Sequence, residues 1–142
     1  TMLLTCSGLY AEKVPPECKI KSQEEIILNI NTLEDWSDLK GFLEETCEHW
    51  RNNKTVMLEA VQQNGYALQY LSNDLKRDKE VVLAAVQQDG WVLQYASDNL
   101  KSDKDVVLAA VQQNGDALYY ASDELEANKD VVLAVVHHAS QR

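Results

Sequence analysis

Basic residues are scarce in this sequence of 142 residues, which has 13 Lys and Arg, 23 Asp and Glu, and a net charge of −10. The acidic excess is spread over the chain, with 5 basic and 10 acidic residues in 1–52 and 8 basic and 13 acidic residues in 53–142. Nucleic acids and anionic membranes are bound by clustered Lys and Arg. We therefore expect no nucleic-acid partner and no membrane partner. The acidity is compatible with a basic protein partner or with a solvated surface that has no specific role.

Cysteine is also rare, and its three occurrences, Cys6, Cys18 and Cys47, follow no regular spacing. An odd number without a C-x-x-C pair does not indicate a disulfide framework. The opening apolar run "TMLLTCSGLYA" is too short to span a bilayer and has no basic residues before it. These features predict a reducing compartment, which is the cytoplasm, or a host-cell cytosol if the chain is delivered as an effector.

Catalytic and metal-binding patterns are missing as well. The sequence has no G-x-x-x-x-G-K, H-E-x-x-H or G-x-S-x-G. On a helix, Cys47 and His49 point about 200° apart, and the adjacent His137 and His138 also diverge, so neither pair can form one site. We predict no catalytic residues, no metal and no cofactor, and hence a protein that is not an enzyme. The alternative is a cysteine-dependent enzyme.

A repeat of 25 residues dominates the rest of the chain. It superimposes lysines, leucines, valines, Gln pairs and glycines of successive units. The recurring residues include Lys54, Lys79, Lys104 and Lys129; Leu58, Leu83, Leu108 and Leu133; Val61, Val86, Val111 and Val136; and Gly65, Gly90 and Gly115. The units are 53–77, 78–102, 103–127 and a partial unit, 128–142.

Each unit has the signals of two helices. Asn or Asp opens the first helix as a cap, as at Asn53 and Asp78, and a largely apolar run of about ten residues follows. Asn64-Gly65 and its equivalents predict the end of this helix, with glycine in the left-handed conformation. The apolar stripe of Leu68, Leu71 and Leu75 predicts a second, shorter helix. Ser72, which Asn73 follows, and the equivalent Ser97 and Ser122 predict a turn or a fresh cap before the last leucine. We expect Leu83, in the middle of a first helix, to be a core residue.

Two short helices cannot bury their apolar faces alone, so neighbouring units must stack. The predicted fold is all-α, an α-solenoid of right- or left-handed twist made from two-helix repeats. We expect an irregular segment at 1–21, an N-terminal helical cap at 22–52 and the tandem repeats at 53–142.

The cap region has its own start signals. Ser22 and Glu25 have capping-box spacing and favour a short helix, with a strand as the alternative because isoleucines follow. Thr32 with Asp35 predicts the start of a second helix that continues through Trp50. The stretch "EEIILNINTLEDWSDLKGFLEETCEHW" also faintly resembles an F-box, which implies an adaptor that presents the repeats to a target.

The repeats themselves carry a more specific resemblance. "LAAVQQDGWVLQYAS" and "LAAVQQNGDALYYAS" resemble the consensus of an uncharacterised family of short tandem helical repeats, a domain of unknown function. The similarity covers Asn53 to about His138. It implies a helical repeat and no established activity.

The function that we predict is a non-catalytic scaffold or adaptor for protein–protein interaction, a monomer that binds a protein partner. Residues that vary while the core stays constant are expected to face solvent and to contact this partner. These residues are Tyr66, Gln69, Trp91, Gln94, Asp116 and Tyr119. The alternative for Trp91 is stacking on Tyr66 and Tyr95 to close the joint between units.

The Gln pairs, such as Gln62-Gln63 and Gln87-Gln88, recur in register. They could offer hydrogen bonds to an extended peptide. The interpretation that we favour is structural, with the side chains bonding one another or the unpaired carbonyls at helix ends.

Overall fold

The computed structural model describes residues 16, 18–20 and 22–141, and within them it contains α-helices and 3₁₀-helices but no strand. This confirms the all-α prediction. The predicted irregular segment at 1–21 lies almost wholly outside the described residues. The longer helices are α2 (Gln23–Thr32), α3 (Trp36–Glu45), α5 (Lys54–Gln63), α6 (Lys79–Val86), α8 (Lys104–Gln113) and α10 (Lys129–Ser140).

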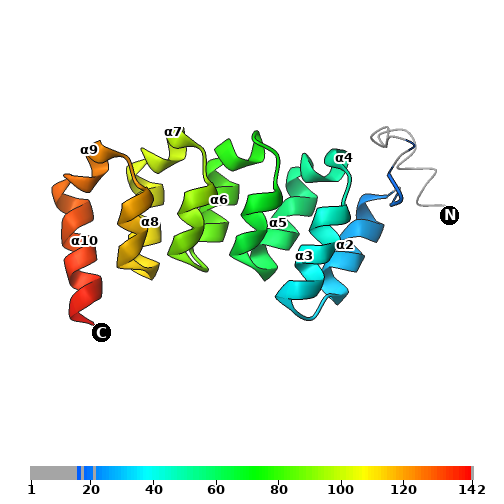
Figure 1. The fold of residues 1–142 in the computed structure, drawn as a ribbon, viewed down its shortest axis with the longest axis horizontal. Helices are drawn as coiled ribbons and strands as arrows, with labels where there is room; N and C mark the ends of the chain where they lie inside the picture. Colours follow the sequence, from blue (N-terminus) through cyan, green and yellow to red (C-terminus); the bar gives the residue numbers. More distant parts are fainter. Residues whose placement is uncertain (1–15, 17, 21, 142) are drawn as a thin grey trace.

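The first helices of the units lie side by side in a row (Figure 1). Along this row α2 contacts α5, α5 contacts α6, α6 contacts α8, and α8 contacts α10. A second row is formed by 3₁₀-helices, η1 (Gly65–Tyr70), η3 (Gly90–Tyr95) and η4 (Gly115–Tyr120), which also contact their neighbours in order. Short elements at one edge complete the units: α4 (Glu48–Arg51), η2 (Leu75–Arg77), α7 (Asp98–Lys101) and α9 (Asp123–Glu126).

The helix starts follow the sequence signals. The side chains of Asn53, Asp78, Asp103 and Asn128 each accept hydrogen bonds from backbone N–H groups in the first turn of the helix that follows. These bonds satisfy donors that a helix start otherwise leaves unpaired. The predicted length of about ten residues agrees with α5 and α8, which have 10 residues each, and with α6, which has 8.

The second helix of each unit begins as a 3₁₀-helix rather than the α-helix that the leucine stripe predicted, and the predicted turn or fresh cap at Ser72, Ser97 and Ser122 is confirmed. Gly65–Tyr70 is a 3₁₀-helix, Leu71 is extended, and a separate 3₁₀ turn begins at Leu75. A 3₁₀-helix rises about 2.0 Å per residue against about 1.5 Å for an α-helix, so six residues reach further along the adjacent helix. After the break, Ser72 N–H donates to the Arg51 carbonyl of the preceding segment, a bond that Ser97 and Ser122 repeat at the same spacing.

The glycines after the first helices do not adopt the predicted left-handed conformation, because no glycine in the described part of the chain has a positive φ. Their role is close approach to the next unit. A Cβ atom built on Gly65 would lie 2.7 Å from the Ala85 carbonyl oxygen, and one built on Gly90 would lie 2.2 Å from that of Ala110. Asn64, which precedes Gly65, caps the 3₁₀-helix by accepting a hydrogen bond from Tyr66 N–H.

The core of the array is formed by the valines and alanines of the first helices. Val81, Val82, Ala85 and Val86 are 0% exposed in α6. Leu83 is only half-buried, which corrects its prediction as a core residue. Leucine at this position lies at the margin of the helix contact because the third, fourth, seventh and eighth residues after the cap face the two neighbouring helices.

The N-terminal region is helical from Ser22, whose side chain accepts from Glu25 N–H, so the strand alternative is wrong. The next helix starts from Asp35 rather than Thr32, because Asp35 accepts from Asp38 N–H. The predicted continuous helix through Trp50 is also wrong. It is broken at Thr46 and Cys47, which have extended backbones, and α4 follows as a separate turn.

A disulfide joins Cys18 to Cys47 across a sequence separation of 29 residues, which contradicts the expectation that the cysteines are unpaired. The Cα atoms are 5.6 Å apart, a normal distance for a disulfide. The break at Cys47 makes the pairing possible, because the segment before α2 passes the start of α4. Trp50 marks the same contact by donating a hydrogen bond to the Ile20 carbonyl.

We expect this disulfide to be detectable by alkylation at the moment of lysis. Peptides that contain Cys18 and Cys47 should be unmodified by iodoacetamide and should be recovered as one linked species in mass spectrometry. Dithiothreitol before alkylation should release and label both, which is the control. Alkylation of either cysteine in the native chain without a reductant would contradict the disulfide.

Candidate protein-binding groove

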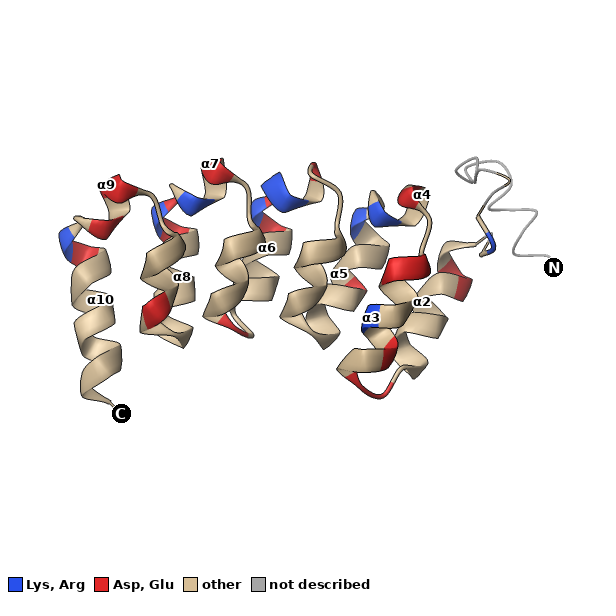
Figure 2. Ribbon diagram, viewed as in Figure 1, with Lys and Arg blue, Asp and Glu red and all other residues tan. Residues whose placement is uncertain are grey.

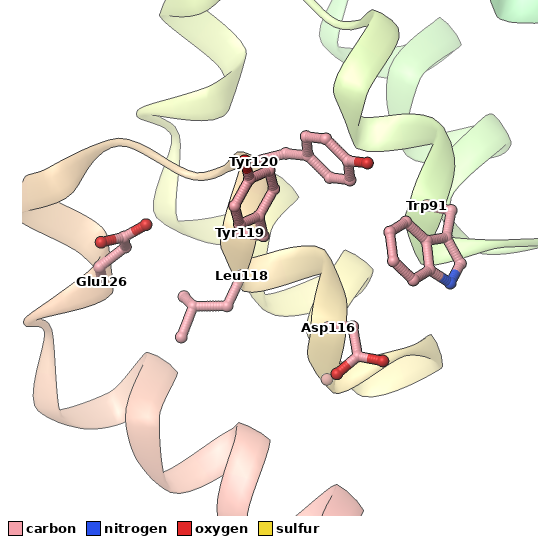
Figure 3. Close-up of a pocket in the computed structure, with 7 residues that line it drawn as sticks. Trp91, Asp116, Leu118, Tyr119, Tyr120 and Glu126 are labelled. Carbon is pink, nitrogen blue, oxygen red and sulfur yellow. The ribbon is translucent and has the colours of Figure 1, made fainter.

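An open groove of about 710 Å³ lies at the junction of η3, η4 and α9 (Figure 3). Its aromatic lining is Trp91 from η3 together with Tyr119 and Tyr120 from η4. The rest of the lining consists of Gly115, Asp116, Leu118 and Glu126. The groove therefore combines ring surfaces with two carboxylates.

The aromatic rings are held edge to face. The ring centroids of Trp91 and Tyr120 are 5.7 Å apart, and those of Tyr119 and Tyr120 are 5.2 Å apart. Such contacts fix the orientation of the rings. Tyr119 is nevertheless 80% exposed, so most of its surface is available to a partner.

The predicted stacking of Trp91 on Tyr66 and Tyr95 is replaced by a different pairing. Trp91 contacts Tyr120 of the next unit, and Tyr66 contacts Tyr95 with centroids 6.4 Å apart. The two residues of each pair are 29 positions apart in the sequence. The aromatic residue that follows the glycine of one unit therefore contacts a tyrosine of the next unit. Trp91 thus has a structural contact as well as a surface in the groove.

Three of the six predicted site residues, Trp91, Asp116 and Tyr119, come together in this groove. The others lie outside it. Gln69 and Gln94 donate hydrogen bonds to the carbonyls of Tyr66 and Trp91 in their own 3₁₀-helices.

Tyr66, the remaining predicted site residue, is half-buried, with its ring between those of Trp36 and Tyr95. Burial first, and then a hydrogen bond with Asp89, raises the pKa of the Tyr66 phenol above its ordinary value. This side chain is therefore neutral at physiological pH and part of the packing between units.

Sequence reasoning missed Leu118, Tyr120 and Glu126 as lining residues. A signal for Tyr120 was present, because Tyr70, Tyr95 and Tyr120 recur every 25 residues. Glu126 had no comparable signal, since its place in the groove depends on how α9 folds back beside η4.

The second glutamine of two pairs has the structural role that we favoured. Gln88 Nε2 donates to the Val61 carbonyl at 2.5 Å, and Gln88 Oε1 accepts from Gly65 N–H at 3.0 Å. Gln63 donates to the Ile30 carbonyl at 2.7 Å. Gln63 and Gln88 therefore satisfy backbone carbonyls near the ends of the preceding helices, and Gln88 also satisfies the N–H group of Gly65. Their amide groups are then not available to a peptide.

A ladder of ion pairs, also missed from sequence, links successive units. Lys54 Nζ lies 3.0 Å from Asp78 and 2.6 Å from Glu80. Lys79 repeats this with Asp103 at 3.0 Å and Asp105 at 2.9 Å, and Lys104 pairs with Asp130. Figure 2 shows blue and red segments close together along the edge of the array where α4, α7 and α9 lie.

Asp78 and Asp103 each cap the first helix of their own unit and also form an ion pair with a lysine of the preceding unit. Burial alone would raise the pKa of Asp78, but hydrogen bonds from Lys54 and from the N–H groups of Val81 and Glu80 outweigh it and lower the pKa below its ordinary value. Hydrogen bonds with Glu80 and Asp78 raise the pKa of Lys54. These carboxylates are therefore already bound within the protein.

The groove carboxylates are different. No ion pair joins Asp116 or Glu126 to any residue that the structure describes. Both side chains are exposed, and Figure 3 shows Asp116 on the side of Trp91 and Glu126 on the opposite side of Tyr119. They can therefore accept donors from an incoming molecule.

Within residues 16, 18–20 and 22–141, no group of three or more His, Cys, Asp or Glu side chains could hold a metal ion. None of the helices in the same ranges has both the length and the apolar character needed to cross a membrane.

The periodic helices, their shared capping bonds and the ion-pair ladder define an all-α protein built from a 25-residue repeat. The chain belongs to the family of the domain of unknown function DUF4116, whose model matches residues 40–76 and 78–126. This confirms the resemblance to an uncharacterised repeat family. The first match begins within α3, before Asn53, and it includes Arg51, the first acceptor in the recurring serine bonds. Comparisons with curated proteins and with solved structures found no match to this chain.

Proposed function

We propose that this protein is a non-catalytic interaction module, an α-solenoid whose groove between η3, η4 and α9 binds a basic segment of a protein partner. The observation that carries the proposal is the combination of exposed ring surface on Tyr119 with the unpaired carboxylates of Asp116 and Glu126. Tyr and Trp are enriched among residues that dominate binding energy at protein interfaces.

The chemistry of the groove favours Arg or Lys as the central residue of the bound segment. A guanidinium or ammonium group over a Tyr or Trp ring gains a cation–π interaction of roughly 0.5–2 kcal/mol. The same cation can form a charge-assisted hydrogen bond with Asp116 or Glu126. The net charge of −10 adds long-range attraction for a basic partner.

The alternatives are less well supported. A cysteine-dependent enzyme needs a free thiolate, whereas Cys47 is joined to Cys18. The F-box-like adaptor stays a prediction, as does the monomeric state. The cytoplasmic compartment also stays a prediction, and the disulfide is an observation against it, because disulfides persist mainly in oxidising compartments.

The test is selection of a displayed library of random short peptides on the immobilised full chain. We expect the selected peptides to be enriched in Arg or Lys beside apolar residues. Binding of a fluorescein-labelled selected peptide, followed by anisotropy, should weaken at least about tenfold in Tyr119→Ala and in Asp116→Asn, a loss of about 1.4 kcal/mol. Raised ionic strength should also weaken it.

The matched control is Leu28→Ala, which truncates another exposed apolar side chain, 63% exposed, on α2. It should leave the affinity unchanged. Tyr119→Ala should also keep the melting temperature of the parent, because the ring is 80% exposed. Peptides without basic residues, or an affinity that Tyr119→Ala does not alter, would remove the groove as the binding site.

A further inference from the structure

The face of α10 that points away from α8 is apolar and exposed. Val132 is 39% exposed, Leu133 54% and Val136 58%, and together they form a continuous patch on one side of the helix. The other side of α10 faces α8, where Val131 is 0% exposed.

The same positions are covered in every preceding unit. Val132 and Val136 are the fourth and eighth residues after the capping residue Asn128. The equivalent residues are Met57, Val82 and Val107 at the fourth position and Val61, Val86 and Val111 at the eighth, and all six are 0% exposed. In each case the first helix of the following unit supplies the cover.

The opposite end of the row is more polar. The helix α2 buries Ile26 and Ile30 against α5, and its outward positions, the third, sixth and seventh after Ser22, are Glu25, Leu28 and Asn29, of which only Leu28 is apolar. Inner units have Val and Ala at these positions, as in Val81 and Ala85. A polar outer face is what a terminal helix needs in water, and α10 does not have one.

The charged residues at this end of the array also differ from those of the inner units. Lys54, Lys79 and Lys104 each pair with acidic residues at the start of the following unit. Lys129 has the equivalent place at the start of α10, and no ion pair joins it to a described residue. The exposed end of the array thus presents an apolar patch beside an unpaired ammonium group.

We propose that the α10 face is a docking surface for one further unit of the same repeat. The helix that fits has an acidic residue at its cap and in its first turn, for Lys129. It has Val at the third position and Ala at the sixth and seventh, for Val132, Leu133 and Val136. The helix α6, which has Val81, Ala84 and Ala85 at these positions, makes the corresponding contact with α5, so the occupant is defined by an interface already present in the chain.

The test is a chain extended in register, in which residues 1–139 are followed directly by a copy of residues 90–114, whose helix has Asp103 at the cap, Val106 at the third position, and Ala109 and Ala110 at the sixth and seventh. We expect a single thermal transition with a melting temperature at least about 5 °C above the parent. The urea m-value should also increase, because a larger surface is exposed on unfolding. An unchanged melting temperature or a separate second transition would overturn the proposal.

Substitutions locate the docking surface. Val136→Asp should shift the melting temperature of the parent by less than about 2 °C, because the side chain is exposed, but it should abolish the gain in the extended chain. Leu28→Asp on α2 is the control and should leave the gain intact. A gain that survives Val136→Asp would show that the added unit does not use this face. Dimerisation of the parent that Val136→Asp removes in sedimentation would assign the face to a second copy instead.

Discussion

Gly90→Ala is expected to lower the free energy of unfolding by about 3 kcal/mol, at the upper end of the usual cost of overpacking. The added Cβ would lie 2.2 Å from the carbonyl oxygen of Ala110, with Ala110 C at 3.1 Å and Asn114 N at 3.2 Å. All three atoms belong to the backbone of α8 or its end, so no side chain can rotate away. Relief requires η3 to move away from α8. Urea denaturation followed by circular dichroism measures the loss.

Two other glycines provide graded controls. Gly115→Ala should cost much less, because its nearest neighbour is a side-chain atom, Val135 Cγ1, at 3.4 Å. Gly41→Ala should stabilise the protein by about 0.5–1 kcal/mol, since Gly41 lies inside α3 with nothing within 4 Å of the added atom. If Gly90→Ala and Gly115→Ala had equal effects, close approach would not be the role of Gly90.

Local signals explain which parts of the fold could be predicted from sequence. A capping side chain such as Asp103 accepts hydrogen bonds from N–H groups two and three residues further along the chain, so a few adjacent residues are enough to predict it. The first helices and their 25-residue spacing followed from such signals. The 3₁₀ segments did not, because the same leucine spacing suits an α-helix, and the neighbouring helix decides between the two.

Contacts between units explain what the sequence did not reveal. Asn64-Gly65 is compatible with a left-handed helix end or with close packing, and only the position of Ala85 distinguishes them. The pairing of Cys18 with Cys47 depends likewise on a break in the helix that its apolar stripe concealed.

The candidate groove was predicted in part. Variation at the positions of Trp91, Asp116 and Tyr119 identified side chains that reach it, because such variation is tolerated where a residue does not pack in the core. The same argument also selected Gln69 and Gln94, although glutamine recurs at this position in two units and donates a hydrogen bond to its own 3₁₀-helix in both.

Burial at equivalent positions leads to a second large effect, a difference between Val82→Ala and Val132→Ala. Val82 is 0% exposed in α6, so removing two methyl groups should cost about 2 kcal/mol in lost burial and cavity formation. Val132 occupies the same position in α10 but is 39% exposed. There the smaller loss of burial is offset by the better helix propensity of Ala, about 0.5 kcal/mol, and the net change should be close to zero.

Urea denaturation of both variants beside the parent measures this difference, with each curve fitted to one transition. The two substitutions remove the same atoms from the same position of the repeat, so intrinsic propensity and side-chain chemistry cancel in the comparison. What remains is the contribution of the following unit, which covers Val82 through α8 and has no counterpart beyond α10 in the described chain. Equal losses would mean that Val132 is covered in solution. In the chain extended by one unit, Val132→Ala should become as costly as Val82→Ala, because the position is then enclosed on both sides.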